Sequence, residues 1–408
     1  MTMKDLPLQR PGRPAPAAAP PVPAFALWQL GFRPFYLLAG TFAALDIVLW
    51  TLQFGGTLEH AVLRGPLWHA HEMLFGYALA VIAGFLLTAV RNWTNRPTPT
   101  GASLMVLAAL WVLARVLVLG PWPIAAALAN AAFPVAVAVG IGIPIVRSRN
   151  RRNYFFVGLL VLLGALALVV HAALGGAIVF DPLHGVRLGL DVVLFIMVVM
   201  AGRVVPMFTN NGIPGLEARR NPIVEKLSLG SVIALFVVDL LPAQALAWAP
   251  ALAGVVALAA ALANATRLAL WQPWRTFSAP LVWVLHVAYA WIVVHLLLRA
   301  GVSAGLVTHS VSVHALTVGG IGGLTLGMMT RTARGHTARP LRADGFEAAM
   351  YGLVFAAAVV RVFGPIASPA HLVGFVQASA ILWAAAFGLY VARSWPVLTR
   401  ARLDGKPG

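Results

Sequence analysis

The side chains with the clearest potential for chemistry lie in one short stretch, Trp68-His69-Ala70-His71-Glu72, at the start of a long apolar run. Ionisable groups on a helix within a membrane are costly, and where they occur they usually have a function. Neutral imidazole is the commonest metal ligand in proteins. We therefore expect His69 and His71 to bind metal, Glu72 to relay protons, and Trp68 to contact a cofactor.

The spacing of these residues limits how they act together. An α-helix turns by about 100° per residue, so His69 and Glu72 share a face, whereas His69 and His71 point about 200° apart. Either the two histidines serve two sites, or the first turn of the helix is irregular. Below Glu72 the same face carries small residues that admit another helix or a flat cofactor, namely Gly76, Ala80, Gly84 and Thr88.

A second candidate site surrounds His314, which is followed by glycines at every fourth position, Gly319, Gly323 and Gly327. A haem needs an axial imidazole and a flat surface free of side chains. The preceding apolar run carries His286 and, on the same face, Tyr289, a candidate catalytic residue. If the two runs are antiparallel neighbours, His286 and His314 lie about 18 and 14 Å below the outer surface and could ligate one metal.

Three arginines are candidate cofactor contacts. Arg33 and Arg203 lie next to aromatic residues and a proline at the inner boundary, and Arg331 opens an inner segment that also contains His336. Arg33 is expected to snorkel to lipid phosphates. For Arg203, snorkelling and a contact with a propionate or quinone head group are equally well supported. The segment from Arg331 to Leu341 either binds anionic lipid or a partner, caps the site from inside, or has no function beyond its charge.

The elements that must position these residues are transmembrane helices. Of the 408 residues, 60% are hydrophobic and 10% are charged, and apolar runs of about twenty residues, long enough to cross a bilayer, recur along the chain. We predict an all-α, polytopic membrane bundle of about twelve spans, at residues 32–54, 67–90, 101–119, 122–146, 154–175, 186–208, 227–246, 248–270, 279–298, 305–330, 345–367 and 370–392.

The basic residues orient the bundle. The formal charge of +17 gathers in alternate short loops, whereas the remaining loops hold only Arg64 and Arg299. By the positive-inside rule, both termini are cytoplasmic. Residues 1–24 are then a disordered Pro/Ala-rich tail, residues 25–395 the transmembrane domain, and residues 396–408 a basic tail. Most histidines and membrane-embedded acids, Asp46 and Glu72 among them, fall in the outer half.

Several functions are excluded. The chain has no cysteine, so it forms no disulfide, cysteine-ligated iron–sulfur cluster, thiolate copper site or covalent c-type haem. It contains no P-loop, dinucleotide fingerprint, nucleophile elbow or HExxH motif, and no aromatic-laced basic surface for nucleic acid.

Five ordered motifs, at Gly31–Phe35, Trp68–Met73, Gly84–Trp93, Gly202–Pro206 and Arg331–Leu341, resemble the NnrS family over residues 31 to about 390. This resemblance implies a twelve-span bacterial inner-membrane protein that contains haem and copper and acts in nitric oxide metabolism and nitrosative-stress resistance. It implies His69, His71, Glu72, His286, His314 and His336 as candidate ligands. The family's last motif usually has Leu before Gly-His-Thr-Gly-Arg, where this chain has Arg334 and then Ala338 in place of the second glycine.

The sequence therefore favours a haem b and copper protein that binds nitric oxide in the outer half of the bundle, and reduces it or otherwise removes it, with a quinol or another electron donor. Two rivals stay open. A secondary transporter would show an internal repeat and a charged midplane site, neither of which we find, and a haem or metal exporter would use the outer histidines as a release path.

Overall fold

A computed structural model describes residues 25–58, 65–241, 246 and 248–406, and within them the chain is helical with no strand. The predicted tail 1–24 lies outside the described residues, as does Arg64. The elements are α1 (Phe32–Phe54), α2 (Gly65–His71), η1 (Glu72–Ala78), α3 (Leu79–Thr94), α4 (Gly101–Val118), α5 (Pro123–Arg147), η2 (Arg151–Asn153), α6 (Tyr154–Leu174), α7 (Pro182–Gly212), α8 (Pro222–Asp239), α9 (Ala249–Leu270), η3 (Pro273–Arg275), α10 (Pro280–Ser303), α11 (His309–His314), η4 (Ala315–Gly322), α12 (Gly323–His336), α13 (Gly345–Ala367), η5 (Pro369–His371) and α14 (Leu372–Thr399).

These elements form twelve long helical rods, because α2, η1 and α3 are continuous and so are α11, η4 and α12. Among the described residues, eleven rods are long and apolar enough to cross a membrane. The twelfth is α8, which carries Glu225, Lys226 and Asp239 near its ends. The predicted fold class, an all-α polytopic membrane bundle, is confirmed.

Local sequence fixes where several rods begin. Proline occupies the first turn of α5, α7, α8 and α10, where its missing N–H would have had no helical partner. The Asn221 side chain accepts hydrogen bonds from the backbone N–H groups of Ile223 and Val224 at the start of α8. Asp344 and Glu347 form a reciprocal capping box at the start of α13. The rods therefore start close to the predicted positions.

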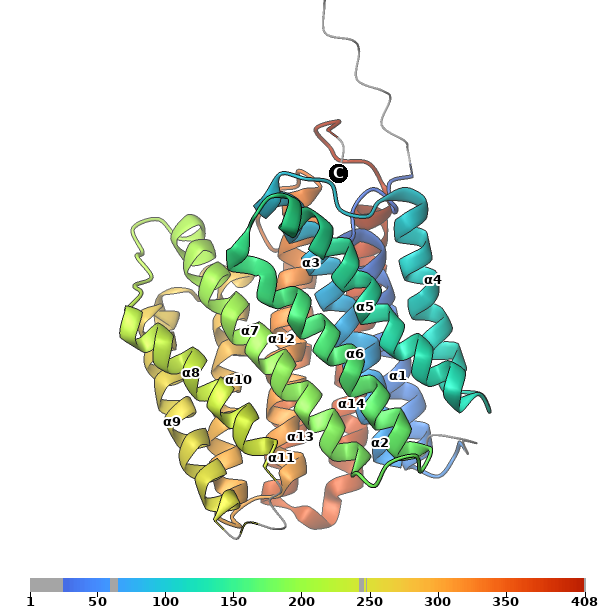
Figure 1. The fold of residues 1–408 in the computed structure, drawn as a ribbon. Coiled ribbons are helices and arrows are strands. Elements are labelled where there is room, and N and C mark those ends of the chain that lie inside the picture. Colours follow the sequence, from blue (N-terminus) through green and yellow to red (C-terminus); the bar gives the residue numbers. More distant parts are fainter. Residues whose placement is uncertain (1–24, 59–64, 242–245, 247, 407–408) are drawn as a thin grey trace, which may run out of the picture.

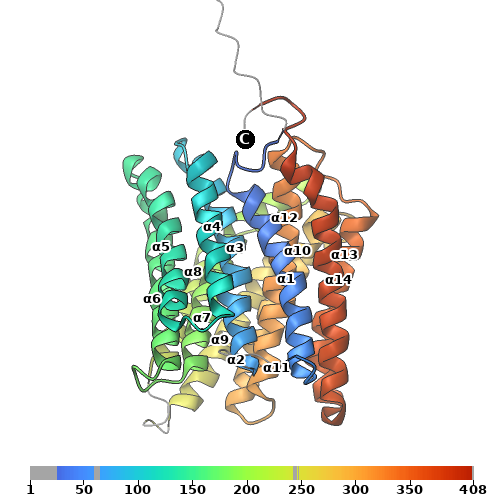
Figure 2. The same cartoon turned by 90° about the vertical axis from the view of Figure 1, so that its right-hand side faces the viewer.

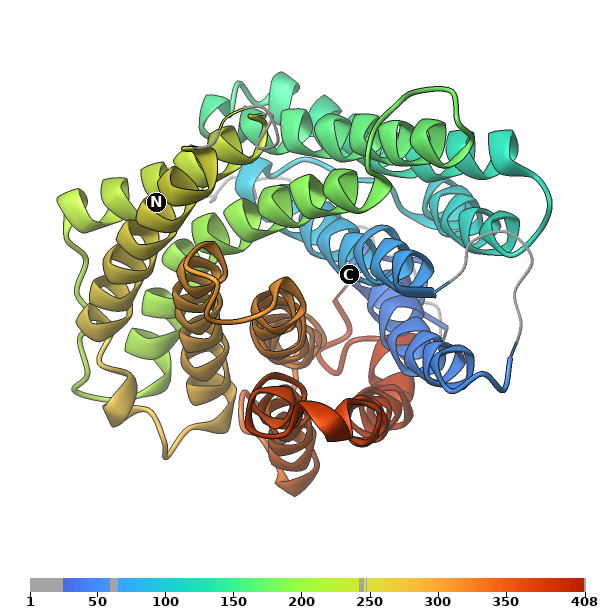
Figure 3. The ribbon, with the colours of Figure 1, turned by 90° about the horizontal axis from the view of Figure 1, so that it is seen from below.

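Four rods form the interior of the bundle: α2–η1–α3, α7, α10 and α11–η4–α12. The others surround them in groups, with α4, α5 and α6 on one side, α8 and α9 on another, and α13 and α14 on a third, as Figures 1 and 3 show. Helix α1 lies between α3 and α14. The interior rods include both of the segments in which the sequence predicted chemistry.

The two ends of the bundle differ. At one, here called the terminal end, the Ala26 N–H donates to the Thr399 carbonyl at 2.7 Å and Arg33 donates to the carbonyls of Leu398 and Arg400 at 2.9 and 2.8 Å. The described parts of both chain ends therefore meet there (Figure 2). At the other, here called the histidine end, α2, α7 and α11 begin (Figure 1). That the terminal end is cytoplasmic stays a prediction.

The small-residue faces are helix contacts. A Cβ built on Gly319 would lie 2.3 Å from the Trp291 ring, and one on Gly327 would lie 2.8 Å from Val284, both on α10. A Cβ on Gly84 would lie 2.9 Å from Phe35 of α1. These glycines therefore allow close approach of neighbouring helices. The face expected to admit another helix or a flat cofactor is a helix–helix packing face.

Candidate metal and cofactor site

The largest described cavity opens at the histidine end and has a volume of about 720 Å³. Side chains from α1, α2, η1, α7, α11, η4, α13 and α14 line it, and most of them are apolar. Its polar lining includes His69, His309, His314, Arg187 and Arg361. A mostly apolar cavity of this size with a few convergent polar groups is typical of a cofactor site.

His69 and His314 approach each other across this cavity. Their rings are nearly parallel, with an interplanar angle of 9° and a centroid separation of 6.4 Å. Two opposed imidazole nitrogens at about 2 Å from one metal would place the ring centroids about 6 Å apart. At this separation both histidines could ligate one metal ion.

The second nitrogen of each ring faces an acceptor. His314 Nδ1 lies 2.7 Å from the Ser310 carbonyl oxygen. His69 Nδ1 lies 3.6 Å from the Asp46 carboxylate, which is fully buried and makes no direct hydrogen bond within the described chain. A carbonyl can only accept, so Nδ1 of His314 carries the proton and its Nε2 keeps a lone pair for a metal. The Asp46 carboxylate is beyond hydrogen-bond distance of His69 Nδ1. Trp50 stacks on the His69 ring at 5.0 Å and fixes its plane.

Two arginines supply positive charge to the cavity wall. Arg361 donates to the Ser310 hydroxyl at 3.1 Å, and Arg187 pairs with Asp181 at 3.0 Å. Guanidinium groups suit the planar carboxylates of haem propionates. Neither Arg187 nor Arg361 was among the cofactor contacts predicted from the sequence.

His71 belongs to a second, separate site. Its Nε2 lies 3.2 Å from Nε2 of His171 on α6, and its Nδ1 lies 2.7 Å from Glu72. Arg115 donates to the same Glu72 oxygen at 2.6 Å and also to Asn130. The two histidines of the opening motif thus serve two sites. The irregular turn also exists, because a π-helical segment, η1, starts at Glu72.

His286 does not join His314. Its Nδ1 lies 3.0 Å from the Val282 carbonyl and its Nε2 lies 3.3 Å from the Thr209 hydroxyl, so both nitrogens have protein partners. Helix α10 runs on to Ser303, five residues beyond the predicted end of that span. His286 consequently lies near the terminal end and His314 near the histidine end, and the equal depth inferred from the sequence is wrong.

Tyr289 also lies away from the cavity. Its hydroxyl donates to Asn264 at 2.5 Å and accepts from Arg267 at 3.1 Å, and Arg267 pairs with Glu225. The described contacts therefore place Tyr289 in an ion-pair network between α8, α9 and α10, and not beside Glu72.

The remaining predicted cofactor contacts are outside the described cavity lining. Trp68 packs with Trp50 and Val118 in a small apolar cluster. Arg203 donates to Asn153 at 2.7 Å and lies over the Trp93, Phe155 and Phe156 rings. Arg331 lies 4.0 Å from the centroid of the Phe208 ring. Like Arg33, Arg203 and Arg331 belong to the terminal end.

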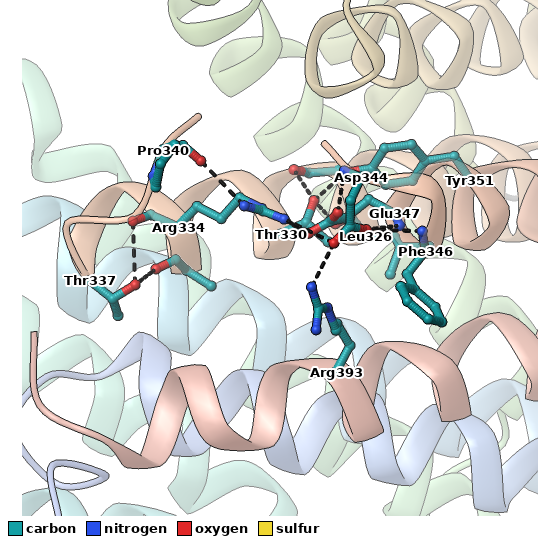
Figure 4. Close-up of polar contacts among 12 residues, drawn as sticks. Leu326, Thr330, Arg334, Thr337, Pro340, Asp344, Phe346, Glu347, Tyr351 and Arg393 are labelled. Atoms are coloured by element: carbon teal, nitrogen blue, oxygen red, sulfur yellow. Dashed lines mark hydrogen bonds and ion pairs between the residues drawn. The ribbon is translucent and has the colours of Figure 1, made fainter. Parts of the chain in front are cut away.

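His336 lies in a fixed segment at the terminal end. Its ring packs 5.5 Å from the Phe32 ring, and its carbonyl accepts from Arg402 at 2.8 Å. Figure 4 shows the neighbouring Arg334, whose Nε and Nη2 donate to Glu347 at 2.8 and 2.5 Å. This network ties the end of α12 to the capping box of α13, and it supplies His336 with no second metal ligand among the described side chains.

Asp344 completes that network outside the membrane-spanning segments. It accepts from Arg393 at 2.6 Å (Figure 4). A hydrogen bond with the Glu347 side chain, together with Arg393, holds the pKa of Asp344 well below its usual range. The charge pattern at this end is structural.

Sequence reasoning missed His171, Trp50 and Arg361 as site residues. Each is an isolated residue in an apolar run, and its partner lies at least nineteen positions away in the sequence. Among the described residues no three His, Asp or Glu side chains converge on one metal position. The two sites are therefore pairs of histidines, each with a carboxylate beside one ring.

The family comparison agrees with this arrangement of rods and histidines. A model of the NnrS protein family matches residues 26–402, nearly the whole chain. The chain belongs to the NnrS family. No curated protein matches it. As an NnrS protein, it matches its family over all twelve rods described above.

Proposed function

We propose that this NnrS protein binds haem b in the cavity at the histidine end and there binds and reduces nitric oxide. The observation that supports this most directly is the nearly parallel pair of His69 and His314, each with one nitrogen turned to an acceptor. When bound, haem would supply a redox-active iron, and a diatomic gas could bind that iron only where one of the two histidines does not ligate it.

The residues of the chain have distinct tasks in this proposal. His69 and His314 would hold the haem, and the Ser310 carbonyl keeps His314 in the tautomer that ligates through Nε2. Arg361 would neutralise a propionate, whereas Arg187 is already paired with Asp181. The apolar lining favours a small uncharged gas over ions, because ions lose hydration on entry.

Reduction requires protons as well as electrons. Two nitric oxide molecules, two electrons and two protons give one nitrous oxide and one water, and a quinol supplies the electrons as it becomes a quinone. Asp46 suits the last proton transfer, because its carboxylate is buried beside the His69 ring and makes no direct hydrogen bond within the described chain. Glu72, the relay expected from the sequence, is instead held by His71 and Arg115.

We also propose copper at His71 and His171. A metal about 2.0 Å from each Nε2 would subtend an N–metal–N angle of roughly 105° at the observed separation of 3.2 Å. Glu72 accepts from His71 Nδ1 and Arg115 holds Glu72, which is the usual carboxylate support of a metal-bound imidazole. Imidazole ligands suit copper, and the chain has no thiolate to offer.

Four variants of the purified protein test both sites at once. We would record reduced-minus-oxidised spectra, with and without nitric oxide, and quantify iron and copper in the same samples. His69→Ala and His314→Ala should lose most of the b-type bands and the iron but keep the copper, and His171→Ala should do the opposite. His286→Ala is the matched control and should keep both metals.

Two results would contradict the assignment. A wild-type spectrum without haem bands after haem-replete expression would remove the redox function. Loss of the bands in His286→Ala, with retention in both His69→Ala and His314→Ala, would move the haem to another part of the bundle.

A further inference from the structure

A smaller cavity of about 220 Å³ lies beside the main one at the histidine end. It is enclosed by α7, the end of α8, the start of α9, α10 and α11, which Figure 3 shows from this end. We call it the acidic cavity. His309, Arg187, Leu190 and Val313 line both cavities, so the two compartments share a wall.

The acidic cavity gathers seven titratable groups from four helices. They are His184, Arg187 and Asp191 on α7, Asp239 on α8, His295 and Arg299 on α10, and His309 on α11. Arg299 pairs with Asp191 at 2.8 Å and also with Asp239. Arg187 has a partner of its own in the exposed Asp181.

Several polar atoms around the cavity are buried without a hydrogen-bond partner in the described structure. They are Nε2 of His295, Nδ1 of His309 and Oδ2 of Asp191. His295 Nδ1 already faces the Ser312 carbonyl at 2.8 Å, so Nδ1 carries the proton of the neutral ring and Nε2 has a free lone pair. His295 and Asp191 are 2% and 4% exposed, which leaves these atoms little contact with water outside the cavity.

The charges of this group do not balance. Asp191 and Asp239 together carry two negative charges, Arg299 carries one positive charge, and Arg187 is neutralised by Asp181. A buried net charge is costly, and it is removed when a neighbouring group takes up one positive charge. A proton bound by one of the buried, unpartnered atoms would supply that positive charge.

We propose that the acidic cavity is a proton-loading site, in which the histidines and Asp191 hold one excess proton and His309 passes it into the main cavity. Its role as a supply of protons for nitric oxide reduction rests on the proposed function. The loading itself depends only on the charges and orphaned atoms described above. His309 is the natural carrier because it lines both compartments.

Loading can be measured without any haem chemistry. We would record infrared difference spectra of the protein between acidic and alkaline pH and follow the imidazolium and carboxyl bands. Asp191→Asn balances the cluster, so a band present in the wild type should disappear or move to lower pH. Asp404→Asn, which alters the Arg402–Asp404 pair outside both cavities, should leave that band in place.

A substitute variant and one contrary result complete this first test. If Asp191→Asn does not fold, Asp239→Asn removes the same charge from the other side of Arg299 and should have the same effect. If the spectra of Asp191→Asn, or of Asp239→Asn in its place, match those of the wild type across the pH range, the proposed proton-loading site is refuted.

Transfer is tested by proton uptake with a pH indicator when nitric oxide is added to the reduced holoprotein. His309→Leu should slow uptake by at least about tenfold, in keeping with the usual contribution of a positioned proton carrier. A small weak acid or free imidazole in the buffer should restore the rate, which a purely structural defect would not allow. His371→Leu, at an exposed histidine outside both cavities, is the control.

The failures are distinguishable. Absence of haem bands or of nitric oxide consumption in the wild type would refute the proposed function and with it the use of the protons, whereas the infrared result would stand. Wild-type uptake rates in His309→Leu, with normal haem bands, would refute the transfer role alone.

Discussion

The buried histidines of this bundle differ in whether they can bind a metal, because their ring nitrogens have different partners. Both nitrogens of His286 are engaged by the chain, whereas His69 and His314 each keep one nitrogen for the cavity. A metal ligand needs a lone pair that the protein has not already used. For these three histidines, the number of engaged ring nitrogens separates the packing residue from the two candidate ligands.

A single backbone position gives a prediction at this scale. Ala338 has φ of +58°, a left-handed conformation that costs an alanine about 1 kcal/mol relative to glycine. The family motif usually has glycine here. Ala338→Gly should therefore raise the free energy of unfolding by about 1 kcal/mol, measurable as a higher Tm from the intrinsic fluorescence of the 13 tryptophans.

Ala343→Gly is the matched control, because Ala343 lies in the same connection and is not among the residues with positive φ. Its Tm should stay unchanged or fall slightly. An equal rise in both variants would mean that flexibility of the connection, and not relief of strain, stabilises the protein.

At the scale of elements, glycines set how closely the rods approach. Gly319→Ala would place a methyl group 2.3 Å from the Trp291 ring, so α10 and η4 must separate. We expect a loss of about 1–3 kcal/mol in stability and a shift of the haem bands, because His314 is on the same rod. Thermal unfolding and the optical spectrum measure the two effects.

Gly352→Ala supplies the comparison, because a Cβ at that exposed helical position meets no atom within 4 Å. It should stabilise α13 by about 1 kcal/mol through helix propensity. Destabilisation by both substitutions to the same extent would show that the α10–η4 contact is looser than described.

The sequence predicted the elements well because apolar length and helix starts are local properties. The spans predicted at 32–54 and 345–367 coincide with α1 and α13. Helix α10 was predicted five residues too short, because Arg299 was taken to end it, whereas Arg299 stays in the helix and pairs with Asp191 and Asp239. The pairing that keeps an arginine in a membrane-spanning helix lies on distant elements and leaves no local signal.

At the scale of the whole molecule, both cavities lie at the end opposite the chain termini. The positive-inside rule puts that end outside the cell. The chain has no cysteine, so a single introduced thiol reports its side without background. In intact spheroplasts an impermeant maleimide should label Thr57→Cys, near the histidine end, but not Thr100→Cys, near the terminal end.

After the membrane is broken, both variants should react, which confirms that both thiols are accessible. Labelling of only Thr100→Cys in intact spheroplasts would reverse the orientation and place the candidate haem cavity on the cytoplasmic side.

The candidate site was predictable only in part at this scale. The opening motif identified His69 and His71 and their opposite directions, because the number of residues between two positions determines the angle between their side chains around a helix. Which helix each histidine faces was not predictable, because His171 and His314 lie about 100 and 245 positions away from their partners. The arginines predicted as cofactor contacts lie outside the lining of the described cavity, and motif membership does not say at which end of the bundle a side chain lies.

The two π-helical segments, η1 and η4, each begin directly after a candidate ligand, His71 and His314. A π turn is the trace of one residue inserted into an α-helix, and removal of that residue restores the α geometry. Deletion of one residue from either segment would leave the glycine-packed part of its rod in register while the histidine-bearing turns rotate by about 100°. These two interior rods therefore each have two independent helical phases, one in the glycine-packed part and one in the turns that carry the candidate ligands. An insertion or a deletion in either segment can change the direction of the candidate ligands without changing the packing of the bundle.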